Sequence, residues 1–279
     1  MSGRREVLIF LSLTLLLSSG FYAYLLFSPG STWIESLSFA FMWCPGVAAI
    51  LTRLLVARKV SGLGWRWGGT WRVLLPVFAL PFLLAGVVYA LVWALGLGAF
   101  DPTRWNAFGA RLGLSGLAAH LAPLAMIPVG VALSSASTLG EELGWRGLLS
   151  DRLRKESSFV RTSLITGAIW SVWHYPLVFV LLPRFRPDLP VAYATACFTA
   201  SVVGVSFFYT WVRQTTGSVW PAAILHSASN AAQSLFEALT RDTGPTEYFT
   251  YEYGIGFVLV IWITLALLWR KVNGAPATA

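Results

Sequence analysis

Charge is scarce in this 279-residue sequence: 11% of its residues are charged, whereas 56% are hydrophobic, and the mean hydropathy is +0.67. Because a soluble domain carries roughly a quarter charged residues, this composition excludes an ordinary soluble protein. A net charge of +8 would suggest a nucleic-acid partner in a soluble chain. Here the basic residues lie beside apolar runs, which fits contact with anionic lipid, and we expect no nucleic-acid partner.

Cysteine and histidine are also rare, with two and three residues. Cys44 and Cys197 both lie in apolar runs without a CxxC motif or a nearby histidine, and we interpret them as packing or lipid-facing residues. No HExxH-type zinc motif is present. The sequence also has no internal repeat, low-complexity tract or soluble domain, so residues 1–279 are interpreted as one membrane domain.

Long apolar runs make up most of the chain. Eight of them approach or exceed the ~20 residues that a helix needs to cross a bilayer. They cover residues 7–27, 34–56, 73–97, 117 to the acidic pair at 141–142, 159–182, 191–212, 218–239 and 255–269. The second is broken at Cys44-Pro45-Gly46, and residues 101–114 are predicted to form an amphipathic segment anchored at the interface by Trp105 and Phe108. The predicted fold class is therefore all-α, a polytopic transmembrane bundle of about eight helices.

The basic residues indicate how these helices are oriented. Alternating the loops along the chain places fifteen of the 20 Lys and Arg residues on the side of both termini, which the positive-inside rule assigns to the cytoplasm. The far loops also carry the acids Asp242, Glu247 and Glu252. The first run follows Arg4 and Arg5, as a signal peptide would, but it is long and lacks a small-x-small cleavage site, so we expect a retained anchor. The expected location is a bacterial or archaeal cell membrane, spanned several times.

The charged stretch Gly140-Glu141-Glu142-Leu143-Gly144-Trp145-Arg146-Gly147 ends the fourth apolar run. A charge at membrane depth costs about 2.5–3.5 kcal/mol or more, so such residues persist mainly where they pair or do chemistry. Glu142 and Arg146 have the i,i+4 spacing of an ion pair that would hold the helix end. Glu141 lies about 100° around the helix and has no partner within the segment, which makes it the first candidate site residue.

Two of the three histidines lie in apolar runs beside other polar groups. His174 follows Trp170 by four residues, so the indole can pack against the imidazole, and the same spacing places His226 and Asn230 on one helical face. His120 has only apolar neighbours and is interpreted as structural or interfacial. Each polar residue alone could serve helix packing. Together with the carboxylate of the charged stretch, however, they suffice for water activation and oxyanion stabilisation.

These three motifs together resemble the CPBP family of intramembrane endopeptidases, which includes CAAX prenyl proteases and bacterial abortive-infection and lysostaphin-resistance-like proteins. The motifs are Glu-Glu-x-x-x-Arg, aromatic-x-x-x-His and His-x-x-x-Asn, on successive spans and in that order. The resemblance covers residues 117–239, the expected catalytic core, with the site between spans 4, 5 and 7. Trp170 stands where the family usually has Phe.

The resemblance implies an intramembrane endopeptidase of the glutamate type that cleaves near the cytoplasmic face. Glu141, with His174, would deprotonate a water, while His226 and Asn230 would donate hydrogen bonds to the oxyanion. Glu142, Arg146 and Trp170 would support them. No cofactor is expected, although Glu141, His174 and His226 could alternatively hold zinc. The expected partners are the lipid bilayer and a membrane-associated protein or peptide substrate, which could be prenylated.

Two other functions remain open at this point. A non-enzymatic immunity or scaffold protein could keep the same shape, and it would tolerate Glu141→Gln. A proton-coupled transporter could use the carboxylate and the histidines as a relay. The sequence shows neither the inverted repeat nor the paired broken helices that many transporters have, which counts against this last interpretation.

Overall fold

The fold was analysed in a computed structural model that describes residues 3–28 and 33–274. Helices make up nearly all of it. In chain order the elements are α1 (Gly3–Phe27), α2 (Trp33–Met42), α3 (Cys44–Ala57), α4 (Trp71–Ala94), β1 (Gly98–Phe100), α5 (Thr103–Arg111), α6 (Gly116–Glu142), the π-helix η1 (Leu143–Ser150), α7 (Asp151–Glu156), α8 (Phe159–Phe185), α9 (Val191–Thr216), α10 (Trp220–Ala238), β2 (Thr240–Asp242), the 3-10 helix η2 (Thr246–Tyr248), α11 (Ile255–Leu267) and α12 (Trp269–Asn273).

The predicted all-α membrane fold is confirmed. Within the described ranges, six helical segments are long and apolar enough to cross a membrane: residues 3–27, 37–57, 71–94, 116–156, 159–185 and 191–216. The seventh and eighth predicted spans are also helical, as α10 and α11. However, α11 has only 13 residues, because it ends at Leu267, before the separate helix α12. The protein is an integral, multi-pass membrane protein.

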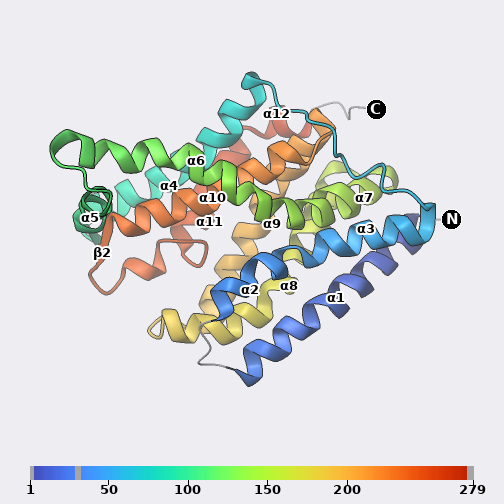
Figure 1. The fold of residues 1–279 in the computed structure, drawn as a ribbon, viewed down its shortest axis with the longest axis horizontal. Helices are drawn as coiled ribbons and strands as arrows, with labels where there is room; N and C mark the ends of the chain where they lie inside the picture. The colour runs from blue at the N-terminus through green and yellow to red at the C-terminus, as the bar shows by residue number, and fades with distance from the viewer. Residues whose placement is uncertain (1–2, 29–32, 275–279) are drawn as a thin grey trace.

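The other helices pack around one long helical rod, which consists of α6, η1 and α7. Figure 1 shows α6 running along the long axis of the molecule and continuing through η1 into α7. Helix α10 packs against both α6 and α4, α8 packs against α9, and α1 packs against α3. The short strands β1 and β2 pair antiparallel, from Gly98 opposite Asp242 to Phe100 opposite Thr240, and join the chain after α4 to the end of α10. Residues from distant parts of the sequence thus meet along the rod.

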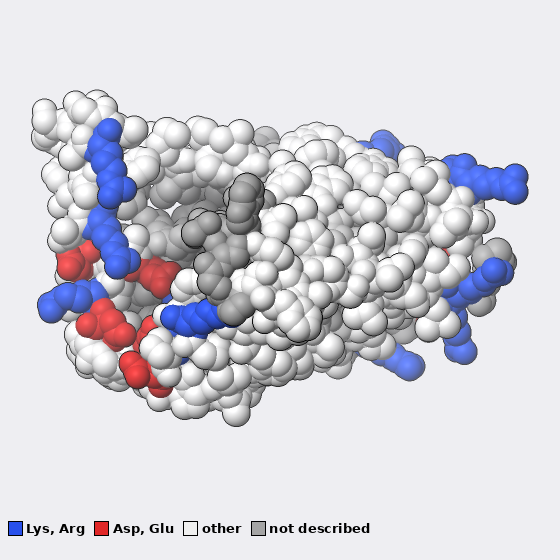
Figure 2. Space-filling view, turned by 60° about the horizontal axis from the view of Figure 1, so that its bottom comes forward, with Lys and Arg blue, Asp and Glu red and all other residues white. Residues whose placement is uncertain are grey.

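The surface has the charge distribution of a membrane protein. In the face that Figure 2 shows, a wide uncharged belt separates two charged ends. One end carries acidic and basic side chains together, whereas only basic side chains are visible at the other. Large apolar side chains are exposed along the helices, such as Leu16 at 68% and Leu133 at 72%. Because soluble monomers rarely expose large contiguous apolar patches, lipid is the natural environment of this belt.

Glycines let α3 approach the acidic end of α6 very closely. The predicted break at Cys44-Pro45-Gly46 is present: α2 ends at Met42, and α3 begins with Pro45 in its first turn. A Cβ atom on Gly140 would lie 2.7 Å from the Met42 carbonyl oxygen, and one on Gly144 would lie 2.5 Å from the Cβ of Pro45. The spacing of these two glycines therefore serves internal packing, which fixes the backbone on both sides of the acidic pair.

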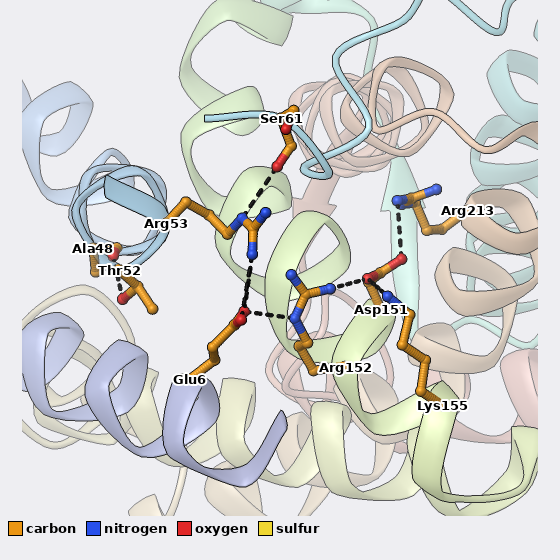
Figure 3. Close-up of polar contacts among 9 residues, drawn as sticks. All are labelled: Glu6, Ala48, Thr52, Arg53, Ser61, Asp151, Arg152, Lys155 and Arg213. Atoms are coloured by element: carbon orange, nitrogen blue, oxygen red, sulfur yellow. Dashed lines mark hydrogen bonds and ion pairs between the residues drawn. The ribbon is translucent and has the colours of Figure 1, made fainter. Parts of the chain in front are cut away.

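An ion-pair network fastens the far end of the rod to three other helices (Figure 3). The Glu6 carboxylate on α1 accepts bonds from Arg53 on α3 at 3.3 Å and from Arg152 on α7 at 2.6 Å. Asp151 binds Arg152 at 2.5 Å and Arg213 of α9 at 3.4 Å. The Arg213 Nε also donates to the backbone oxygen of Arg146 inside η1, at 3.2 Å. The π-helical segment is thus held from α9 as well as from its own ends.

Candidate active site

A cavity of about 610 Å³ brings the predicted site residues together. Its lining includes Glu141 from α6, Trp170 and His174 from α8, and His226 and Asn230 from α10. These helices correspond to the fourth, fifth and seventh predicted spans. Glu142 and Arg146 are fully buried and lie behind the cavity wall rather than in it.

Glu141 is held by two tryptophans. The indole Nε1 of Trp170 donates to Oε2 of Glu141 at 2.7 Å, and the indole of Trp145 donates to the same oxygen at 3.4 Å. Oε1 is the second oxygen of this side chain, which lines the cavity. The expectation that Glu141 lacks a partner in its own segment was therefore wrong, because it considered only charged partners. One carboxylate oxygen is anchored, and the other remains available to the cavity.

His174 has its tautomer set by the backbone. Its Nδ1 lies 3.1 Å from the Trp170 carbonyl oxygen, which can only accept a hydrogen bond, so Nδ1 carries the proton. The Nε2 atom of the neutral ring then has a free lone pair. Trp173 packs edge-on against the ring at 4.7 Å between centroids, and Phe198 contacts it at 5.5 Å. The imidazole is thus presented to the cavity as a hydrogen-bond acceptor.

His226 also bonds through Nδ1, but its partner is a carboxylate rather than a backbone carbonyl. Its Nδ1 lies 3.0 Å from Oε1 of Glu142, which also accepts a bond from Arg146 at 3.1 Å. A carboxylate that already accepts from a guanidinium acts as an acceptor again, so Nδ1 of His226 is the donor. Only a ring that carries a proton on each nitrogen could also donate a hydrogen bond from Nε2. The predicted Glu142–Arg146 pair is present, and it additionally orients a histidine 84 residues away.

Arg146 is enclosed between two aromatic rings. Its guanidinium carbon lies 4.3 Å from the ring centroid of Trp170 and 4.2 Å from that of Tyr209. Its NH2 group also donates to the Ser206 hydroxyl at 3.3 Å. The Trp170 ring in turn packs edge-on against His226 at 5.3 Å. One aromatic side chain therefore links the carboxylate, the buried cation and the second histidine.

Several lining residues were not predicted to belong to the site. Asn230 is exposed to the cavity as expected, and Gln233 follows it on the same face, 8% exposed and with its Oε1 unpaired within the described chain. Tyr209 and Glu252 also line the cavity. A three-residue spacing could have indicated Gln233. Nothing in the local sequence indicates Tyr209 or Glu252, which come from other parts of the chain.

The remaining wall of the cavity is apolar. Side chains from α1, α2, α4, α8, α9 and α11 form it, and these include Phe21, Phe41, Leu84, Leu181, Val202 and Phe257. A polar cluster therefore lies at one part of a space that could hold a large apolar group.

The third histidine lies outside this cavity. His120, on α6, is exposed, and its Nδ1 bonds with the Asn106 side chain of α5 at 2.9 Å. Trp105 on α5 donates to the His120 backbone oxygen at 3.1 Å. The predicted amphipathic segment is thus fastened to the start of α6, and His120 has a structural role there.

The comparisons with known proteins found one family and one relative that are similar to part of the chain. Residues 122–232 match the family described as type II CAAX prenyl endopeptidase Rce1-like. The chain is also 34% identical over 119 residues to CAAX prenyl protease 2 of Methanococcus maripaludis. That similarity spans 42% of this chain and 43% of the relative. The matched family segment contains all the predicted catalytic and supporting residues, from Glu141 to Asn230.

Proposed function

We propose, from the match of residues 122–232 to the Rce1-like CAAX prenyl endopeptidase family, that this chain is an intramembrane endopeptidase of that family. The observation that carries the proposal is one cavity lined by Glu141, two histidines and Asn230 from three helices. His174 bonds a backbone carbonyl oxygen through Nδ1, and His226 bonds the buried carboxylate of Glu142 through the same atom. Hydrolysis of an amide needs both a base for water and a donor for the oxyanion.

Glu141 and His174 activate the attacking water. A water in the cavity can donate one proton to the open oxygen of Glu141 and the other to Nε2 of His174, so both acceptors orient its oxygen towards a carbonyl carbon. Glu141 accepts the proton as the water attacks. Because Trp170 and Trp145 hold the other carboxylate oxygen, Glu141 keeps this geometry without reorganisation.

His226 and Asn230 stabilise the oxyanion. The imidazolium of His226, paired with Glu142, donates from Nε2, and Asn230 donates from its amide one turn along α10. A single donor of this kind is worth about 3–4 kcal/mol in other proteases. Arg146 offsets the charge of Glu142 and holds the aromatic rings that position His226.

The substrate is a membrane-associated protein or peptide, and a prenylated chain fits the apolar wall of the cavity. His226 is the seventh residue of α10, roughly 9 Å along the helix axis from its start. With both termini in the cytoplasm, the start of α10 faces that side, so the scissile bond would lie below the cytoplasmic surface. The chemistry requires no cofactor. A zinc ion held by Glu141, His174 and His226 is the alternative.

The test compares the termini of membrane proteins in cells that carry the wild-type chain or Glu141→Gln. New termini that appear only with wild type would establish proteolysis and identify the substrate. His174→Ala and His226→Ala should also abolish the new termini, whereas His120→Ala, a histidine outside the cavity, should leave them unchanged. Identical termini for wild type and Glu141→Gln, at equal abundance and folding, would refute the protease and favour the scaffold interpretation.

A further inference from the structure

One carboxyl group in the cavity has no part in the steps above. Glu252 lies in the connection between β2 and α11, far in sequence from the family motifs. Its side chain lines the same cavity as Glu141, His226 and Asn230. It forms no ion pair within the described residues, in contrast to Glu247 of the same connection, which binds Arg186 at 3.0 Å.

The backbone on both sides of Glu252 is fixed. The Tyr193 hydroxyl donates to the Tyr248 carbonyl oxygen at 2.5 Å and accepts the N–H of Ile255 at 3.2 Å. Gly254 packs directly against the backbone of Phe249 and Thr250, where a Cβ would collide. These contacts hold the loop in one conformation, so the position of Glu252 at the cavity is fixed by its backbone.

The two residues next to Glu252 in the chain are both tyrosines held by packing contacts. Tyr251 has a positive φ of 60° and lies under the Arg186 guanidinium at 5.0 Å. Tyr253 stacks on Phe198 at 5.6 Å, and Phe198 contacts His174. The two tyrosines are thus used for packing, and the carboxyl between them lies in the cavity with the site residues.

The charged and titratable groups around Glu252 favour a protonated acid. The groups whose charge acts on Glu252 are Glu141 of α6, His226 of α10 and Arg186 at the end of α8, and Tyr253 is its neighbour in the chain. Burial outweighs the attraction of the cations and raises the pKa of Glu252 to about 7. A neutral carboxyl in an apolar cavity carries a proton that it can give to a reacting group.

Amide hydrolysis needs such a proton at the leaving nitrogen. We propose that Glu252 is a further catalytic residue, the general acid that protonates the departing amine; this inference rests on the proposed function. As the C–N bond breaks, its electron pair stays on nitrogen, which takes the proton of Glu252. The acyl carbon keeps the oxygen of the water, whose proton is on Glu141. After the products leave, Glu141 releases that proton to solvent and Glu252 regains one, which balances the cycle.

The test uses the purified full chain and two peptides. The first is a prenylated CAAX peptide, in which the bond that wild type cleaves is located by mass spectrometry. The second has an ester in place of that amide. An alcohol leaves with far less protonation than an amine, so an acid on the leaving group matters mainly for the amide. Glu252→Gln should therefore lower amide turnover by about 100-fold or more and ester turnover by less than about threefold.

The matched control is Glu247→Gln, which removes a carboxyl of the same connection that lies outside this cavity, and both turnovers should stay within about twofold. In wild type, amide turnover should fall as pH rises through about 7, where Glu252 loses its proton, and ester turnover should not. Should Glu252→Gln fail to fold, Glu252→Asp keeps an acid, and its amide turnover should fall more than its ester turnover.

Two results would overturn the inference. Equal losses on the two peptides would show that Glu252 only supports the structure, and an unchanged amide turnover in Glu252→Gln would show that it donates no proton. Failure of wild type to cleave either peptide, together with identical membrane termini for wild type and Glu141→Gln, would instead refute the proposed function itself.

Discussion

The hydrogen bond from Trp170 to Glu141 gives the sharpest prediction about how the base is positioned. Trp170→Phe removes the indole N–H that lies 2.7 Å from Oε2 but keeps an aromatic ring against Arg146 and His226. A hydrogen bond to a charged group contributes about 1.5–3 kcal/mol. Because the weaker bond from Trp145 at 3.4 Å remains, we expect most of this amount to be lost in the transition state. That corresponds to a fall in kcat of roughly 10- to 150-fold, at 1.36 kcal/mol per factor of ten.

The assay is steady-state cleavage of the prenylated peptide by purified protein, with kcat and KM measured separately. We expect KM to change little, since the bond positions the base rather than the substrate. Trp173→Phe is the matched control. It also removes a buried indole donor, 2.8 Å from the Ser18 hydroxyl, but one that does not touch Glu141. A Trp170→Phe protein with wild-type kcat, or an equal fall for both variants, would refute the idea that this bond holds the base.

Three further outcomes follow from contacts outside the reaction itself. Gly144→Ala places a Cβ against Pro45 and should lower stability in detergent by about 1–3 kcal/mol, measured by thermal unfolding, whereas Gly130→Ala meets open space and should not. Asp151→Asn removes an acceptor shared by three basic side chains and should cost about 1–3 kcal/mol, while Glu156→Gln loses only an exposed pair and should cost less than about 1 kcal/mol. Strong chelator should leave cleavage by purified protein intact, and loss that zinc alone restores would favour the metal alternative.

Contacts within one helix could be predicted from the sequence. Glu142 and Arg146 are four residues apart, and their 3.1 Å contact follows from helical geometry. The bond between Glu142 and His226 could not be predicted in this way, because it depends on how α10 packs against α6. The tryptophan partners of Glu141 had a signal that was overlooked: a buried indole usually needs an acceptor, and Trp145 lies one turn from an unpaired carboxylate.

The periodic pattern of apolar residues could not predict irregularities of the backbone. The segment after Glu142 has the composition of an ordinary α-helix, so nothing indicated the π-helix at Leu143–Ser150. Glu252 was assigned to a far loop because it lies between the seventh and eighth predicted spans. The fold returns that connection to the cavity through aromatic contacts with α9, which lies about 50 residues earlier in the chain.

The π-helix also sets the rotational phase between the two halves of the long rod. Glu141 of α6 faces the reaction cavity, whereas Asp151 and Arg152, just beyond the π-helix, contact α9 and α1. Removing one residue from Leu143–Ser150 would turn everything after it by about 100° relative to the acids. The chain could then keep Glu141 in the cavity or keep the ion pairs of Asp151 and Arg152, but not both. The number of residues in this segment is thus itself constrained, and a one-residue deletion there should be more harmful than replacing Leu148 or Leu149 with another apolar residue.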